Sequence, residues 1–232
     1  MAPFHIAVYL FNGGDLMDFS GPVEVYSASP SSEDPTFEIT TFAHHHTIRV
    51  QTNALVYTPN ATFEEVSKNL SEYDILVVPG SHGEVVKSVI ASREGRELAE
   101  LIKKFAALPP RQPGGRRVLQ SVCTGAILLA SAGILAGRTV TSHHMDLDLL
   151  KQVADEAAGG DSKINIVRKR WVHAGKTDAG VEIVNAGGIT SGIDTSLWVY
   201  EQFAGKERAE WVAEVEEFER RADAWGMKKF VD

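Results

Sequence analysis

The sequence predicts an α/β protein in which helices cover both faces of a mainly parallel sheet. Strand-like and helix-like runs alternate along the chain, and this alternation is typical of parallel sheets with crossover helices. Several strand-like runs, such as residues 75–79, are apolar throughout, as expected for strands covered on both faces. The chain has 232 residues, of which 44% are hydrophobic and 23% charged, so it is long enough to bury a layered core.

Seven segments are expected to form strands, because each is rich in apolar or β-branched residues and ends at a turn signal. They are residues 5–11, 37–43, 74–79, 117–122, 138–142, 164–173 and 181–186. The last two are joined through Gly175 and Gly180, which favours an antiparallel hairpin.

Helices are expected between these strands, where apolar residues recur about every 3.6 positions or good helix formers dominate. They are residues 21–28, 63–69, 93–107, 124–132, 145–157 and 193–203.

The C-terminal residues 207–225 are predicted to form an amphipathic helix. Its apolar stripe would consist of Trp211, Val215, Phe218, Ala222 and Trp225. We expect this stripe to dock on the protein's own body, and a partner-binding helix is the alternative. No repeat or long linker divides the chain, so we expect one domain over residues 1–232, with 206–232 as a C-terminal helical extension.

Composition excludes several classes of protein. The net charge of −8 argues against nucleic-acid binding, because phosphate binding needs a concentrated positive patch. A single cysteine cannot form an internal disulfide. The apolar runs are far shorter than the ~20 residues of a membrane span, and the N-terminus lacks a signal-peptide pattern. We therefore expect a cytoplasmic protein with no membrane or nucleic-acid partner.

The sharpest local signal surrounds the cysteine. The expected strand 117–122 runs into Cys123, and a helix of small and apolar residues follows directly. Ser121 and Gly125 lie two positions before and after it, the pattern of a strand–nucleophile–helix elbow. A helix N-terminus stabilises a thiolate, so we expect the pKa of Cys123 to lie below the ordinary ~8.5. A buried, inert cysteine is the alternative.

Asp18 follows the first expected strand, within the segment 15–22. The carboxyl ends of parallel strands share one edge of a sheet, so Asp18 is expected to face the thiol. Capping of a helix over residues 21–28 remains an open alternative. Residues 79–83 end another strand, and their backbone N–H groups suit an oxyanion, although any strand-ending turn can carry glycine.

Two further segments indicate what the protein does not bind. The glycine-rich turn 185–194 lacks both the glycine spacing and the lysine of nucleotide-binding loops. The three histidines at positions 44–46 would alternate faces in an extended strand and could not converge on one ion. We therefore expect neither a nucleotide nor a metal site.

Four motifs, in this order, resemble those of the DJ-1/PfpI superfamily, and most closely its isonitrile (isocyanide) hydratase branch. They are MDFSGP at 17–22, VPG at 78–80, SVCTG at 121–125 and GGITSGID at 187–194. The resemblance covers residues 5–205 and implies a flavodoxin-like sandwich, usually a homodimer, that acts on a small molecule without a cofactor. The same motifs occur in AraC-type transcription regulators. This chain ends soon after its last motif, which we interpret as the absence of their DNA-binding module.

The resemblance also implies a role for each matching residue. Cys123 would be the nucleophile, Asp18 its acidic partner, and Thr124 a source of a backbone N–H and a hydroxyl. Thr124 stands where peptidase-like members carry histidine, which argues against a Cys-His protease. The residues expected to contact the substrate or an oxyanion are Gly80, Ser81, Gly188, Ile189 and His143. His144 replaces the aromatic residue of hydratase relatives and would alter the shape of the pocket.

The enzyme hypothesis is hydration of an isocyanide, R–NC, to an N-substituted formamide. The Cys123 thiolate would attack the terminal carbon while Asp18, kept protonated by burial, delivers a proton to the nitrogen. One competing hypothesis is a non-catalytic or redox-responsive sensor that acts through oxidation of Cys123. The other is a glyoxalase-type activity with His143 as the base.

Overall fold

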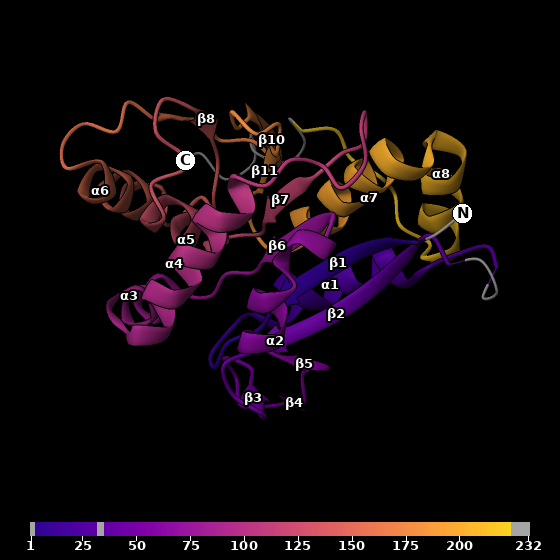
Figure 1. Ribbon diagram of the computed structural model, residues 1–232, viewed down its shortest axis with the longest axis horizontal. Helices are drawn as coiled ribbons and strands as arrows, with labels where there is room; N and C mark the ends of the chain where they lie inside the picture. The colour runs from indigo at the N-terminus through magenta and orange to yellow at the C-terminus, as the bar shows by residue number, and fades with distance from the viewer. Residues whose placement is uncertain (1–2, 32–34, 224–232) are drawn as a thin grey trace.

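The computed structural model describes residues 3–31 and 35–223, and its centre is one seven-stranded sheet (Figure 1). The strands of this sheet are β1 (Phe4–Tyr9), β2 (Phe37–Ala43), β5 (Ala61–Thr62), β6 (Ile75–Val78), β7 (Val118–Ser121), β10 (Trp171–Lys176) and β11 (Glu182–Ala186). They lie in the order β10-β11-β7-β6-β1-β2-β5, and only β10 runs antiparallel to its neighbour. The predicted mainly parallel sheet is confirmed.

The register of the central strands brings three loops to one edge of the sheet. Val78 at the end of β6 pairs with Ser121 at the end of β7, and Ser121 also pairs with Asn185 of β11. The segments that follow these strands therefore start side by side, at the edge where ligands bind in parallel sheets.

Helices cover both faces of the sheet. They are α1 (Leu16–Ser27), α2 (Phe63–Lys68), α3 (Gly83–Ala91), α4 (Arg93–Ala106), α5 (Gly125–Ser131), α6 (Leu147–Ala158), α7 (Ser191–Ala204) and α8 (Lys206–Val215). Along β1, Ala7 and Tyr9 enter a core with α4 and α5, whereas Ile6 and Val8 enter a second core with α1 and α7. Figure 1 shows α7 and α8 together, away from the group α3 to α6. Of the helices within the described ranges, none is long and apolar enough to cross a membrane.

The first helix begins five residues earlier than the sequence predicts. Asp15 caps α1 by accepting a hydrogen bond from the Met17 N–H at 3.0 Å, and Pro22 lies inside the helix. Proline removes one backbone donor, so the sequence pattern favours a later start, but the helix runs continuously through Pro22. Asp18 therefore lies in the first turn of α1 and is not its cap, and the capping alternative is wrong.

The predicted strand 164–173 is split by the structure. Its first part, β9 (Asn165–Ile166), pairs with β8 (Thr139–Val140) in a separate two-stranded sheet. Its second part belongs to β10, which pairs antiparallel with β11, so the expected hairpin is confirmed. The small hairpin of β3 (Ile48–Arg49) and β4 (Val56–Tyr57) and the helix α3 were not predicted.

The C-terminal helix is shorter than predicted. It ends at Val215, and Glu217 has a φ of +49°, so the chain turns away before Phe218. Val215 is 56% exposed, and the buried face of α8 consists of Ala209, Val212 and Ala213. Trp211 and Phe218 pack against the core beneath α7, which confirms docking on the protein's own body for these two. Trp225, the last residue of the predicted stripe, lies outside the described residues.

Candidate active site

Cys123 lies in the sharp turn between β7 and α5, with a φ of +57° that side-chain-bearing residues seldom adopt. Two hydrogen bonds hold its backbone there. The Cys123 N–H donates to the Gly187 carbonyl at 2.8 Å, and the Ser142 hydroxyl donates to the Cys123 carbonyl at 2.9 Å. The loops on either side thus impose the strained conformation predicted for a nucleophile elbow.

Asp18 lies beside this cysteine although 105 positions separate them in the chain, because both leave the same sheet edge. Its side chain is fully buried, and Oδ2 accepts a hydrogen bond from the Gly80 N–H at 3.0 Å. A hydrogen bond also joins its carboxyl group to the Cys123 thiol. Oδ1 is buried and has no well-aligned partner among the described residues.

Burial and, to a smaller extent, the negative charge of Asp15 raise the pKa of Asp18 from its ordinary value to about 7, although its hydrogen bonds from Gly80 and Cys123 act in the opposite direction. Burial and the adjacent Asp18 also raise the pKa of the Cys123 thiol above its ordinary range. The backbone N–H groups of Thr124 and Ile189 favour the thiolate but do not outweigh these effects. The sequence-based expectation of a lowered thiol pKa is therefore wrong, because the helix N-terminus acts against burial and a neighbouring carboxylate.

These two shifts make Asp18 and Cys123 a coupled pair. Near neutral pH the carboxyl group loses its proton first, and the thiol then keeps its own because the carboxylate lies beside it. A carboxylate in contact with a thiol can take the thiol proton as the sulfur attacks an electrophile. It can then return that proton to the product. The pair suits a nucleophilic addition in which a proton is shuttled.

Thr124, Gly80 and Ser81 stabilise the loops beneath the thiol. The Thr124 hydroxyl donates to the Ser81 carbonyl at 2.5 Å and accepts from the Ser81 N–H at 2.8 Å. A side chain at Gly80 would collide with the Thr124 hydroxyl and with the Gly125 nitrogen, so glycine is required there. The N–H of Gly80 binds Asp18 and that of Ser81 binds Thr124, so neither donor faces the pocket as an oxyanion site would require.

Gly188, Ile189 and His143 meet on the other side of the thiol. Ile189 has a φ of +32°, and its backbone N–H donates to the Cys123 sulfur. A Cβ at Gly188 would lie 2.6 Å from Cδ2 of His143, so glycine allows the loop to approach the imidazole. Burial and His144 lower the pKa of His143, which favours its neutral form.

Above Cys123 the surface opens into a pocket of about 520 Å³. It is lined by Asp15, Leu16, Met17, Val50, Gln51, Thr52, Ser81, His82, Gly83, Cys123, His143, Met145, Asp146 and Ile189. Sequence reasoning did not assign Asp15, His82, Asp146 or residues 50–52 to the site. Asp15 and His82 lie within motifs that it did single out, whereas residues 50–52 reach the pocket only through tertiary packing.

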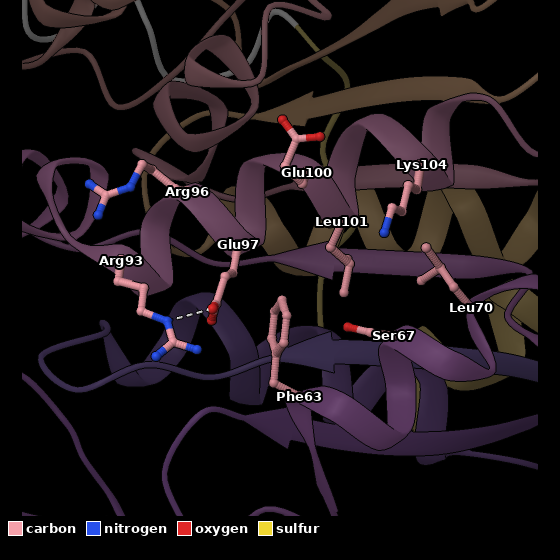
Figure 2. A pocket seen from close by; sticks show the side chains of 9 residues that line it. All are labelled: Phe63, Ser67, Leu70, Arg93, Arg96, Glu97, Glu100, Leu101 and Lys104. Atoms are coloured by element: carbon pink, nitrogen blue, oxygen red, sulfur yellow. Dashed lines mark hydrogen bonds and ion pairs between the residues drawn. The ribbon is translucent and has the colours of Figure 1, made fainter.

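A second pocket, of about 330 Å³, lies between α2 and α4 (Figure 2). Figure 2 shows Phe63 pointing toward Glu97 and Leu101 across this pocket. Arg93 donates to Glu97 at 2.7 Å on its rim. None of its lining residues also lines the Cys123 pocket, and they include no cysteine or histidine, so it offers no comparable nucleophile.

The three histidines at positions 44–46 follow β2 and do not lie within a strand. The ring of His44 stacks on Phe63 with a centroid separation of 3.8 Å, and its Nε2 lies 3.2 Å from Glu97. His45 pairs with Glu94 at 2.9 Å. Within the described part of the chain, no three histidine, cysteine or acidic side chains are grouped to hold a metal ion.

One buried ion pair that sequence reasoning missed supports the Gly188–Ile189 loop. Nε of Arg170 donates to Oδ2 of Asp194 at 2.5 Å, and its Nη2 donates to the Thr190 hydroxyl at 3.1 Å. The Arg170 carbonyl accepts from the Gly187 N–H at 2.8 Å. The pair therefore ties both ends of the loop that presents the Ile189 N–H to the thiol. Only the three-dimensional structure shows that Arg170 and Asp194 meet.

Comparisons with known proteins agree with this geometry. The DJ-1/PfpI family profile matches residues 5–186. An isonitrile hydratase of Pseudomonas putida is 27% identical over 207 residues, which cover 89% of this chain and 75% of the hydratase. A ThiJ/PfpI family structure from Pseudomonas syringae superimposes with a TM-score of 0.70 at 20% identity, covering 96% of this chain and 78% of the other. An AraC family regulator structure from Pseudomonas putida gives 0.69 at 17% identity, covering 92% and 100%. These two structures show a shared fold.

Proposed function

Because the chain belongs to the DJ-1/PfpI family, we propose that it hydrates isocyanides to N-substituted formamides, as a hydro-lyase. The observation that carries this proposal is the buried Cys123–Asp18 pair, in which one carboxyl oxygen has no well-aligned partner. The similarity to an isonitrile hydratase supports the choice of substrate. No step of the reaction requires a metal or an organic cofactor.

In the first step, Asp18 takes the thiol proton as the Cys123 sulfur bonds to the terminal carbon of R–NC. The Thr124 and Ile189 N–H groups stabilise negative charge on the sulfur. Asp18 then gives the proton to the same carbon, which yields the thioimidate R–N=CH–S–Cys123. The sequence-based expectation placed this proton on nitrogen, but a thioimidate carries its hydrogen on carbon, and protonation at nitrogen would leave a carbene.

In the second step, water adds to the thioimidate carbon and the nitrogen gains a proton, giving R–NH–CH(OH)–S–Cys123. Among the described residues, Asp18 is the carboxyl group that contacts the thiol. It can take a proton from the attacking water and pass it to the nitrogen, and on collapse it can carry the hydroxyl proton to the leaving sulfur. Collapse releases R–NH–CHO and the free thiol. The sum is R–NC plus H₂O giving the formamide, and the enzyme is regenerated unchanged.

The test is a turnover assay with a simple alkyl isocyanide, in which the formamide is measured by NMR. We expect Cys123→Ser and Asp18→Asn each to lower turnover by at least ~10²-fold, the scale for losing a nucleophile or a general acid–base. Asp178→Asn serves as the control, because Asp178 is exposed in the turn between β10 and β11, at the opposite sheet edge.

Two results would contradict the proposal. Turnover of methylglyoxal without turnover of isocyanides would favour the glyoxalase alternative. Absence of turnover on either substrate, together with oxidation of Cys123 under mild peroxide, would favour the redox sensor.

A further inference from the structure

The Cys123 pocket has several apolar side chains in its lining. Leu16, Met17, Val50, Met145 and Ile189 line it. Met17 and Ile189 are each 37% exposed and Met145 is 78% exposed, so exposed apolar side chains gather around the buried thiol. Such a concentration indicates a surface that receives an apolar group.

The charged groups of the same pocket are all acidic. Asp15 and Asp146 line it, and among the described residues no lysine or arginine does. The charge of Asp15 acts on the catalytic Asp18, and the charges of Asp146 and Asp15 both act on His143 in the wall of the pocket. Lys87, which lines a neighbouring hollow together with Asp146, is paired with Glu84 at 2.8 Å.

His143 lies beside one of these carboxylates, with its Nδ1 3.7 Å from Oδ2 of Asp146. Burial and His144 lower the pKa of His143 and favour the neutral imidazole, which does not offset the two negative charges. His82 also lines the pocket. A cleft that carries charge of one sign between low-dielectric walls concentrates its field and repels ligands of the same sign.

We propose that Asp15 and Asp146 make this pocket charge-selective, so that it admits reactants with a neutral or cationic apolar substituent and rejects anionic ones. The inference rests on the proposed function for its substrate class. Isocyanides with alkyl, aryl or ammonium substituents fit the pocket, and isocyanides that carry a carboxylate do not.

Cys123 is the only cysteine of the chain, so thiol reagents report on this pocket alone. The probes are two methanethiosulfonates of similar size, one with a trimethylammonium and one with a sulfonate group, at about pH 8 and low salt. The quantity compared is the labelling rate with the cationic reagent divided by the rate with the anionic reagent. We expect this ratio to be at least ~10-fold higher for Cys123 in the protein than for a small free thiol. Salt at about 0.5 M should remove most of this preference.

Two variants assign the effect to residues. Asp15→Asn and Asp146→Asn should each lower the preference several-fold, and asparagine at position 15 can still cap α1. Both variants change the reactivity of Cys123 itself, but that change affects the two reagents equally and cancels in their ratio. Asp178→Asn, at the opposite sheet edge, should leave the ratio unchanged. A wild-type preference equal to that of the free thiol would overturn the inference, as would variants that keep the full preference.

A second measurement separates this inference from the proposed function. We expect kcat/KM for the methyl ester of isocyanoacetate to exceed that for the isocyanoacetate anion by at least ~10-fold. Equal values would overturn the charge selection while isocyanide hydration stands. Charge-selective labelling of Cys123 without turnover of either compound would retain the charge selection and refute the hydratase.

Discussion

In the proposed reaction the carboxyl group of Asp18 carries most of the chemistry, because burial, with the charge of Asp15, raises its pKa to about 7. An ordinary exposed aspartate, with a pKa near ~3.9, would be too weak a base to take a thiol proton. The same burial and the charge of Asp15 make Asp18 a competent acid once it holds that proton. Two opposite roles thus follow from one desolvated side chain.

We predict that kcat/KM for isocyanide hydration rises about tenfold per pH unit below pH ~7 and is level above it. In the active form the Asp18 carboxyl group is ionised and the Cys123 thiol holds its proton. This form is lost when Asp18 is protonated. The measurement is a pH–rate profile from about pH 5 to pH 9. A profile with its midpoint near pH ~4, or one that is flat, would contradict the role of Asp18 as the base.

The pH dependence of the unfolding free energy should reflect the raised pKa of Asp18. The folded state holds the Asp18 proton up to about pH 7, whereas the unfolded chain releases it near ~3.9, so stability falls as the pH rises through this window. Asp18→Asn has no carboxyl group at this position, so its stability does not fall in this way. We expect it to gain about 2 kcal/mol of unfolding free energy relative to the wild type between pH ~5 and ~8. Glu216, also raised to about 7, is present in both proteins and cancels. A pH-independent difference in urea denaturation would refute the assignment.

The loop between β11 and α7 depends on the buried pair of Arg170 and Asp194. Asp194 also accepts the Arg221 N–H at 2.6 Å, so the segment after α8 is tied to the same carboxylate. These contacts hold Ile189 at its strained φ of +32°, with its N–H on the sulfur. One carboxylate thereby joins the C-terminal segment to the site.

We predict that Asp194→Asn destabilises the protein by about 3 kcal/mol, because it removes the negative charge from its buried ion pair with Arg170. It should also raise the pKa of Cys123 further, because the Ile189 N–H is less well held. Unfolding in urea and the pH dependence of Cys123 alkylation measure the two effects. Lys169→Met is the control. It removes the half-exposed contact with Asp223 and should cost less than ~1 kcal/mol. If the pH dependence of Cys123 alkylation were unchanged in Asp194→Asn, the Arg170–Asp194 pair would stabilise the fold without acting on the thiol.

For the whole molecule, we propose a homodimer. Leu55 and Val56, in and beside the β3–β4 hairpin, are 43% and 50% exposed, and adjacent residues 50–52 reach the pocket. Exposed apolar side chains of this size favour burial against a second copy. Light scattering should give about twice 25.3 kDa, and Val56→Asp should shift the mass toward the monomer. A wild-type mass of one chain at all concentrations would refute the dimer.

The sequence by itself determined the fold class and the centre of the site. Alternating periodicities predicted the parallel sheet, because residues that face a core recur at intervals set by local backbone geometry. The small residues around Cys123 predicted the elbow, since a tight turn excludes larger side chains there. Asp18 was placed at the same edge because parallel strands end together.

Only the tertiary structure decided the features that depend on distant groups. The N–H of Gly80 binds Asp18, and Arg170 meets Asp194 across 24 positions of the chain. The direction of the Cys123 pKa shift was predicted wrongly, because the helix N-terminus is visible in the sequence but burial and the contact with Asp18 are not. Desolvation and Coulomb interactions depend on how close groups lie in space, whereas periodicity and turn chemistry depend only on neighbours along the chain.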